Sequence, residues 1–288
     1  MSRLEPIAEN KPSTDTSSSS RRSALIEQLQ QQLDKANRDL VQKNIQLEHQ
    51  LEIAAQVHES MLPKPVTHPK IDVDIRYLPI EAVGGDYCQV RIPQPDTCYI
   101  TMCDVTGHGI GAALMATRVS SEVRHFILDM LAPRQIVSEL NAFIMNNFAD
   151  TGLFLSFIAV RIDLSSRTLT YSGSGHPAAL LLRGNGEQPV ILASQNPLIG
   201  VFENCLSDQP EQTVKLEKSD RLLLYTDGLI ENAKNPVSSA EIDFLADIAA
   251  GAMSVNLFKM ADVILEQMTQ FHRGPAIDDT TLIVAELK

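Results

Sequence analysis

The sequence predicts an α+β protein in which antiparallel sheets carry helices on their outer faces, preceded by a long N-terminal helix. Strand-like runs dominate the chain after residue 62, and turns of hairpin length link most of them. Helical stretches come in pairs and do not alternate singly with strands, which favours antiparallel sheets over βαβ units. Residues 23–60 lack glycine and proline, so they form one continuous helix-compatible segment.

The bulk composition limits the classes of partner. With 288 residues, the chain can hold one large domain and an appendage. Its net charge of −12, from 24 basic and 36 acidic residues, argues against a nucleic-acid or anionic-membrane surface. No apolar run approaches the roughly 20 residues that span a bilayer, and no signal-peptide core is visible. We therefore expect a soluble cytoplasmic protein with no membrane insertion.

The N-terminal part divides into two predicted segments. Residues 1–22 are polar and low in complexity, so we expect a disordered tail there. Residues 23–62 follow as a helical coiled-coil segment, and 63–288 as the globular domain, because Pro63 and Pro65 cannot continue a helix.

The helix over residues 23–60 carries an apolar row with a seven-residue repeat. The first positions of the repeat are Ile26, Leu33, Leu40, Leu47, Ala54 and Met61. Leu29, Ala36 and Val57 fill the matching d positions, while Lys43 and Gln50 interrupt that row. Two interpretations fit: a dimerising coiled coil that carries a signal, or a single helix lying on the following domain. The length of the row favours a homodimer through residues 23–60.

The globular part predicts nine strands and four helices. The strand-like runs are 71–78, 86–92, 97–103, 154–163, 167–173, 178–183, 189–193, 221–226 and 280–286. The helical stretches are 109–131, 133–149, 238–250 and 257–271. Ser238 and Glu241 have the spacing of a capping box that opens the third helix. The Met and Phe stripe of the last helix suits either a ligand groove or the core, and its helical spacing favours the core.

Acidic residues mark the ends of four of these strands. Asp86 and Asp104 are equally far along the chain from Pro95, which lies in a predicted hairpin turn. A hairpin would place their carboxylates side by side at one sheet end. Asp227 ends another strand, and Asp278 and Asp279 precede the last one. This pattern predicts a carboxylate cluster that holds hard metal ions.

Two other kinds of site are disfavoured. Cys88, Cys98, Cys103 and Cys205 form no CxxC pair, so buried reduced thiols are favoured over a disulfide or zinc site. GHGIGAAL resembles a nucleotide loop, but Asp104 just before it would repel a phosphate unless a metal intervened. The chain also contains no GxxxxGK[ST] motif.

Six motifs carry a family resemblance. In order they are VGGDY, DVTGHGIGAALMA, FLSF, SGSGHPAALLL, LLLYTDGLIEN and DDTTLIV. Together they resemble the bacterial PPM phosphatases, which are type 2C-like serine/threonine phosphatases. The likeness is to the branch that includes sporulation stage II protein E and the sigma-factor-regulating phosphatases. AAQVHESMLPKPV resembles the segment that leads into that domain, so the resemblance covers about residues 53–288.

The resemblance implies a PPM-type α-β-β-α sandwich with two Mn²⁺ or Mg²⁺ ions at one end. Asp104 would bridge both ions, and the carbonyl of Val105 would bind one of them. Asp227 and Asp278 would hold the other. Asp86 would serve the second ion, directly or through water. The ions, about 3.5–4 Å apart, would activate a bridging water and clamp the phosphoryl oxygens, so no protein nucleophile is needed.

Several neighbouring residues have open roles. Gly107 and Gly109 would let the backbone approach the site closely. His108 and His176 suit either general acids or ties within glycine-rich turns, and the second role is favoured. Asp279 is a metal ligand or orients its turn, and the resemblance ranks it below Asp278 as a ligand. For Glu231, a solvated or loop-anchoring role is favoured over a ligand role.

The chain departs from the family pattern at two positions. Gln89 stands where the family often has a second acid, and Ser156 stands where it often has threonine. Neither change removes a principal ligand of the resemblance, so both bear on metal affinity and regulation.

Three functions compete. The first is an active phosphoserine/phosphothreonine phosphatase acting on a phosphorylated STAS-fold anti-sigma-factor antagonist. The second is a binding module that sequesters such a partner, and the third is a metal-dependent phosphodiesterase. Retention of Asp104, Asp227 and Asp278 favours the first over the second. No sensory domain is evident, so an activating signal would reach the helix from an upstream sensor or regulator, or through the tail.

Overall fold

The computed structural model describes residues 16–107, 109–231, 239–272 and 277–288. The chain forms two compact units, Met1–Glu52 and Ile53–Lys288, each with contacts mainly within itself. Helix α1 (Thr16–Met61) fills the described part of the first unit and enters the second. It begins before the predicted start at residue 23, so it includes residues 16–22, which we expected in the tail. Its apolar row is exposed: Leu33 and Leu40 keep 60% and 57% of their surface accessible. None of the described helices is long and apolar enough to cross a bilayer.

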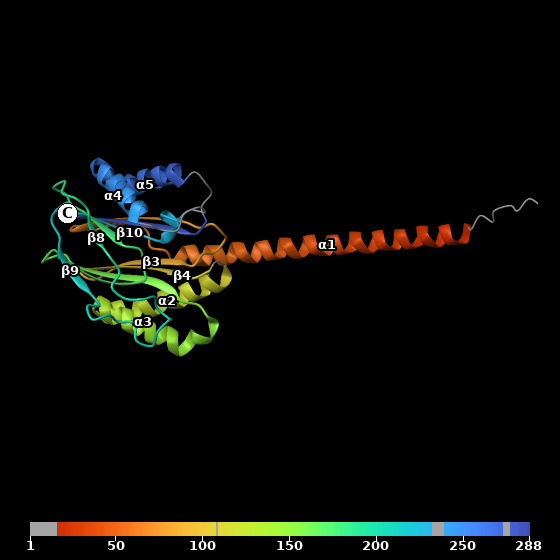
Figure 1. The fold of residues 1–288 in the computed structure, drawn as a ribbon, viewed down its shortest axis with the longest axis horizontal. Coiled ribbons are helices and arrows are strands. Elements are labelled where there is room, and N and C mark those ends of the chain that lie inside the picture. The colour runs from red at the N-terminus through yellow and green to blue at the C-terminus, as the bar shows by residue number, and fades with distance from the viewer. Residues whose placement is uncertain (1–15, 108, 232–238, 273–276) are drawn as a thin grey trace, which may run out of the picture. The chain divides into compact units, whose positions relative to one another are not determined.

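The second unit is an α-β-β-α sandwich, as predicted (Figure 1). Helices α2 (Ile110–Leu128) and α3 (Pro133–Phe148) cover one outer face, and α4 (Ser239–Gly251) and α5 (Leu257–His272) cover the other. Ser238 of the predicted capping box lies outside the described residues.

Two antiparallel sheets form the middle layers. The five-stranded sheet has the order β3-β4-β5-β6-β9, with bounds Asp86–Gln94, Thr97–Val105, Leu155–Asp163, Thr168–Ser174 and Gln212–Lys215. The six-stranded sheet has the order β1-β2-β11-β10-β7-β8, with bounds Val66–Thr67, Ile71–Leu78, Thr280–Leu287, Arg221–Tyr225, Ala179–Leu182 and Val190–Leu192. All nine predicted strands are present. The sequence analysis missed β1 and β9, because β1 has two residues and β9 (QTVK) is a polar edge strand with little burial.

Side chains along each strand alternate between the two faces of its sheet, and this divides the core into layers. Ile100 and Met102 of β4 pack between the sheets with Ile283 of β11. Their neighbours on β4, such as Cys103 and Val105, face α2 and α3 instead. Tyr225 and Val284 face α4 and α5. Since successive side chains of a strand point to opposite faces, both sheets bury both of their faces.

All four cysteines are free and buried, which confirms the prediction of reduced thiols. Burial raises the pKa of the Cys205 thiol above its ordinary value and that of Cys98 to about 12, so both are protonated at neutral pH.

Candidate metal centre

The hairpin β3–β4 brings two of the predicted acids together. Its register places Asp86 directly opposite Asp104, as predicted from their symmetric spacing around Pro95. Asp86 is 1% exposed and points toward the six-stranded sheet, because its Oδ2 accepts hydrogen bonds from that sheet's end. The β3–β4 pair therefore presents two adjacent carboxylates at one end of the sandwich.

The other two acids lie at the matching end of the six-stranded sheet. Strands β10 and β11 pair with Tyr225 opposite Leu282. Asp227 follows β10 in a single 3-10 turn, and Asp278 precedes β11. In an antiparallel pair the end of one strand lies beside the start of the other. Asp227 and Asp278 therefore lie at the same end of the six-stranded sheet.

Two threonines join the sheet ends. Thr226 Oγ1 donates to Asp86 Oδ2 over 2.8 Å, and Thr281 Oγ1 donates to the same oxygen over 2.6 Å. The backbone N–H of Thr281 donates to Thr226 Oγ1 over 2.9 Å, which orients that hydroxyl. Sequence reasoning missed both threonines, although they stand beside the acids in YTDG and DDTT.

Burial and mutual repulsion raise the pKa values of the clustered acids. Burial, and then the charges of Asp227 and Asp278, raise the pKa of Asp104 to about 7. Burial, and then the charges of Glu231 and Asp278, raise the pKa of Asp227 to about 6. Burial and the neighbouring Asp104 also raise the pKa of Asp86 well above its ordinary value. Shifts of this kind arise where like charges share a desolvated site.

The donor set fits a hard cation. None of the described lysines and arginines forms an ion pair with Asp86, Asp104 or Asp227. Within the described part of the chain, the buried Oδ1 of Asp227 has no hydrogen-bond partner. Oxygen donors with excess negative charge suit Mg²⁺ or Mn²⁺ better than zinc. Among the described residues, no three Asp, Glu, His or Cys side chains form a group that could hold a metal ion as they stand.

Close backbone approach at this site also depends on the glycines that flank Asp86 and Asp227 in the sequence. A Cβ on Gly85 would lie 2.7 Å from the Val105 carbonyl oxygen, and one on Gly228 would lie 2.1 Å from the Asp279 carbonyl oxygen. Gly107 and Gly109 instead have positive φ angles of 86° and 80°. Nothing lies within 4 Å of a Cβ at Gly107, so backbone conformation is what requires glycine there.

His176 ties a turn to the strand next to Asp104. It is buried, and its Nδ1 lies 2.9 Å from Ser156 Oγ. Ser156 pairs with Asp104 across β4 and β5. Burial lowers the pKa of His176 to about 3, so the imidazole is neutral at physiological pH. His108 lies outside the described residues.

Gln89 lies on the opposite face of β3 from Asp86. It is three residues further along a strand, so its side chain points toward α2. Its Nε2 donates to the Ser120 carbonyl over 2.8 Å, and its Oε1 accepts from Arg91 over 3.0 Å. This departure from the family pattern therefore does not face the acid cluster.

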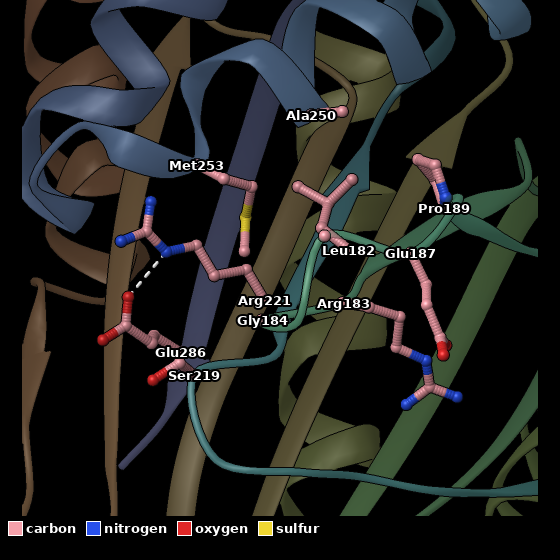
Figure 2. Close-up of a pocket in the computed structure, with 11 residues that line it drawn as sticks. Leu182, Arg183, Gly184, Glu187, Pro189, Ser219, Arg221, Ala250, Met253 and Glu286 are labelled. Atoms are coloured by element: carbon pink, nitrogen blue, oxygen red, sulfur yellow. Dashed lines mark hydrogen bonds and ion pairs between the residues drawn. The ribbon is translucent and has the colours of Figure 1, made fainter.

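A separate cavity of about 340 Å³ opens between β7, β10, β11 and α4 (Figure 2). Arg221 begins β10 and pairs with Glu286, near the end of β11, over 2.6 Å. The acid cluster follows the end of β10 and precedes the start of β11. The cavity thus lies at the other end of the strands, and none of the clustered acids lines it.

Comparison with known proteins identifies a family. The sequence model described as Stage II sporulation protein E (SpoIIE) matches residues 94–288, which leaves Asp86 just outside the match. Phosphoserine phosphatase RsbP of Bacillus subtilis is 25% identical over 251 residues, which cover 86% of this chain and 60% of RsbP. The chain thus spans less than two thirds of that relative.

Solved structures share the fold. The SiaA-PP2C domain of Pseudomonas aeruginosa superposes with a TM-score of 0.71 at 20% identity, over 85% of this chain and 98% of that one. RsbX in complex with magnesium superposes with a TM-score of 0.58 at 15% identity, over 78% of this chain and 99% of that one. Both likenesses support the sandwich architecture.

Proposed function

Because the chain belongs to the stage II sporulation protein E (SpoIIE) family, we propose that it is a metal-dependent protein serine/threonine phosphatase of the PPM type. The observation that carries the proposal is the meeting of strand-end carboxylates from both sheets, with raised pKa values and no described basic partner for Asp104. The name of RsbP, a phosphoserine phosphatase, supports the reaction. The magnesium complex of RsbX supports the cofactor.

The acids would hold two Mn²⁺ or Mg²⁺ ions. Asp104 would bridge them, and the Val105 carbonyl would bind one. Asp227 and Asp278 would hold the other, and Asp86 would serve the second ion directly or through water. When bound, the ions would supply an activated water and neutralise charge on the phosphoryl group.

The protein's own groups would prepare this centre. Thr226 and Thr281 occupy one oxygen of Asp86, so that carboxylate cannot rotate freely. The clustered negative charge would repel a phosphoester in the absence of cations, which makes metal loading a condition for substrate binding. His176, neutral and bonded to Ser156, would support strand β5 beside Asp104 and would not act as a general acid.

The substrate we infer is a phosphorylated STAS-like protein, an anti-sigma-factor antagonist, since such proteins are the targets expected for this branch. This role would place the enzyme in the cytoplasm. The second candidate is a catalytically weak module that sequesters the same partner. Strongly perturbed acids favour the enzyme, because perturbed pKa values cluster at functional sites.

We also propose that residues 23–60 form a homodimeric coiled coil that transmits an upstream signal. The exposed apolar row of α1 supports dimerisation. The last turns of the helix belong to the second unit, where the His58 ring lies 5.7 Å from the Tyr77 ring and Leu62 packs against the core between the sheets. Movement of the helix would therefore reach β2 directly.

The test is phosphate release from phosphorylated STAS-domain proteins by the purified full chain. Release with Mn²⁺ or Mg²⁺, absent with EDTA and absent in Asp104→Asn, is expected. A stable complex with the phosphoprotein and no release under any metal would favour the sequestering module. Neither release nor complex formation across a panel of such proteins would contradict the substrate class.

A further inference from the structure

Asp279 stands beside the proposed metal ligands, yet both of its oxygens face backbone donors. Its Oδ1 accepts the Ile80 N–H over 2.9 Å, and its Oδ2 accepts the Gly85 N–H over 3.0 Å. The residue is 3% exposed. A Cβ on Gly84 would lie 2.0 Å from Asp279 Oδ2, so the backbone of this segment packs directly against the carboxylate.

The segment that Asp279 holds leads straight into Asp86. Residues 79–85 connect β2 to β3 without regular structure. Because Ile80 and Gly85 lie outside the strands, their N–H groups need acceptors other than a strand ladder, and buried unpaired donors are costly. Asp279 bonds one donor near the beginning of the segment and one at its end, immediately before Asp86. Hydrogen bonds to a carboxylate are stronger than neutral ones, so the segment is pinned at both ends.

Asp86 is thus held from two directions by the six-stranded sheet. Thr226 and Thr281 bond its Oδ2, and Asp279 bonds the N–H of the preceding residue. We propose that Asp279 is a positioning residue that fixes Asp86 for metal binding and is not itself a metal ligand. The proposal rests on the metal centre proposed above.

Asp278 differs from Asp279 in its surroundings. The charges of Asp278 and Asp279 both raise the pKa of Asp104, and that of Asp278 also raises the pKa of Asp227. Asp278 Oδ1 accepts the N–H of Asp279 over 2.8 Å, so it also orients the neighbouring backbone. Both oxygens of Asp279, in contrast, accept a backbone N–H of the segment that leads to Asp86. This division assigns adjacent aspartates to different tasks.

The first measurement is amide hydrogen exchange in the metal-free protein. Asp279→Asn leaves one acceptor for two donors, so exchange at Ile80 or Gly85 should accelerate at least tenfold. Gly84→Ala keeps the carboxylate but displaces it, and should accelerate the same amides. Asp278→Asn is the matched control, and exchange at Ile80 and Gly85 should stay within twofold of wild type. Unchanged exchange at both amides in both Asp279→Asn and Gly84→Ala would overturn the proposal.

The second measurement is Mn²⁺ binding by titration calorimetry. Asp279→Asn should weaken binding several-fold while the number of bound ions stays the same. If Asp279 acts only through Asp86, the double variant Asp86→Asn/Asp279→Asn should bind Mn²⁺ as weakly as Asp86→Asn alone. Additive losses would make Asp279 an independent ligand and overturn the proposal.

The two proposals fail in distinguishable ways. A wild-type protein that binds neither Mn²⁺ nor Mg²⁺ would overturn the proposed function, and the positioning role would fall with it. Normal wild-type binding with additive losses would overturn the role of Asp279 alone. If Asp279→Asn does not fold, Gly84→Ala replaces it in the amide exchange measurement. Gly84→Ala and the double variant Gly84→Ala/Asp86→Asn then replace it in the Mn²⁺ titrations.

Discussion

Asp104 illustrates how a single residue can oppose folding and support function. Burial and then the charges of Asp227 and Asp278 raise its pKa, and it stands opposite Asp86 in the β3–β4 hairpin. Without cations, its ionised form is repelled by its neighbours and desolvated. Functional sites commonly carry such destabilising groups.

Asp104→Asn should therefore change activity and stability in opposite directions. Turnover should fall at least about a hundredfold, or about 2.7 kcal/mol of transition-state stabilisation, because the proposed bridging charge is lost. In EDTA, the free energy of unfolding should rise by about 1–3 kcal/mol as repulsion is removed. Steady-state rates and urea unfolding check the two effects. Retained activity, or a less stable metal-free protein, would contradict this interpretation.

His176 gives a pH-dependent prediction at the same scale. Its folded pKa is about 3, below the unfolded value of 6.5, so between these values the unfolded chain binds a proton that the folded one does not. Its neutral burial is therefore favourable near neutral pH and increasingly unfavourable as pH falls below about 6.5. The wild type should lose stability relative to His176→Asn by up to about 1.4 kcal/mol per pH unit.

Urea unfolding of both proteins between pH 7 and 4.5, at one metal concentration, measures this difference. The acid cluster is common to both proteins, so its titration cancels in the comparison. A stability difference that does not change with pH would show that His176 has the same pKa in the folded and unfolded states, and would contradict the prediction.

Helix α1 exposes a row of large apolar side chains. Leu40 and Leu47 are more than half exposed, and Lys43 and Gln50 interrupt the neighbouring row. A seam of this kind gives weak association, and a switch needs only a few kcal/mol between its states. If the helix carries a signal as proposed, the contact between His58 and Tyr77 of β2 would pass its movement toward the segment that precedes Asp86.

Leu40→Asp and Leu47→Asp should each convert a dimer to a monomer and change the rate of phosphoprotein dephosphorylation. Gln31→Asp, on the outer face of the same helix, is the matched control and should leave both unchanged. Deletion of residues 1–52 should reproduce the monomer. Light scattering and phosphate release are the measurements. If the variants are monomers with wild-type activity, the helix only joins two copies and does not regulate them. If all variants remain dimers, the dimer interface lies outside this helix.

At the scale of the whole molecule, metal binding and folding should be coupled. Four strand ends from two sheets supply the proposed ligands, so ions would cross-link the halves of the sandwich. A ligand that binds only the folded state stabilises it by about 2.7 kcal/mol at a hundredfold excess over its Kd. The sandwich should therefore be more stable with Mn²⁺ or Mg²⁺ than in EDTA.

Thermal unfolding should show this as a rise in Tm of about 5–10 °C, since each kcal/mol shifts Tm by about 2–4 °C for a domain of this size. Activity should disappear in EDTA and return with either ion, because sites with few protein ligands per ion release them to a chelator. KCl at equal ionic strength is the control. Full activity after exhaustive EDTA treatment would contradict metal dependence.

Much of this architecture was predictable from local patterns. Turn spacing predicted the β3–β4 hairpin and the pairing of Asp86 with Asp104, because hairpin register depends on residues close in sequence. All four helices of the sandwich were likewise predicted from apolar periodicity. β9 escaped detection because its residues are polar and packing, not periodicity, recruits them to the edge.

The contacts that organise the site could not be predicted from such local patterns. Thr226 and Thr281 reach Asp86 across 140 and 195 residues of sequence, and Asp279 reaches Gly85 across 194. Nothing local distinguishes Asp279, which bonds two backbone amides, from Asp278, which stands among the acids. The presence of an acidic residue at the end of a strand can be seen in the sequence of that strand alone. Which acid faces a cation and which faces a loop depends on how two sheets pack, and only the tertiary structure decides that.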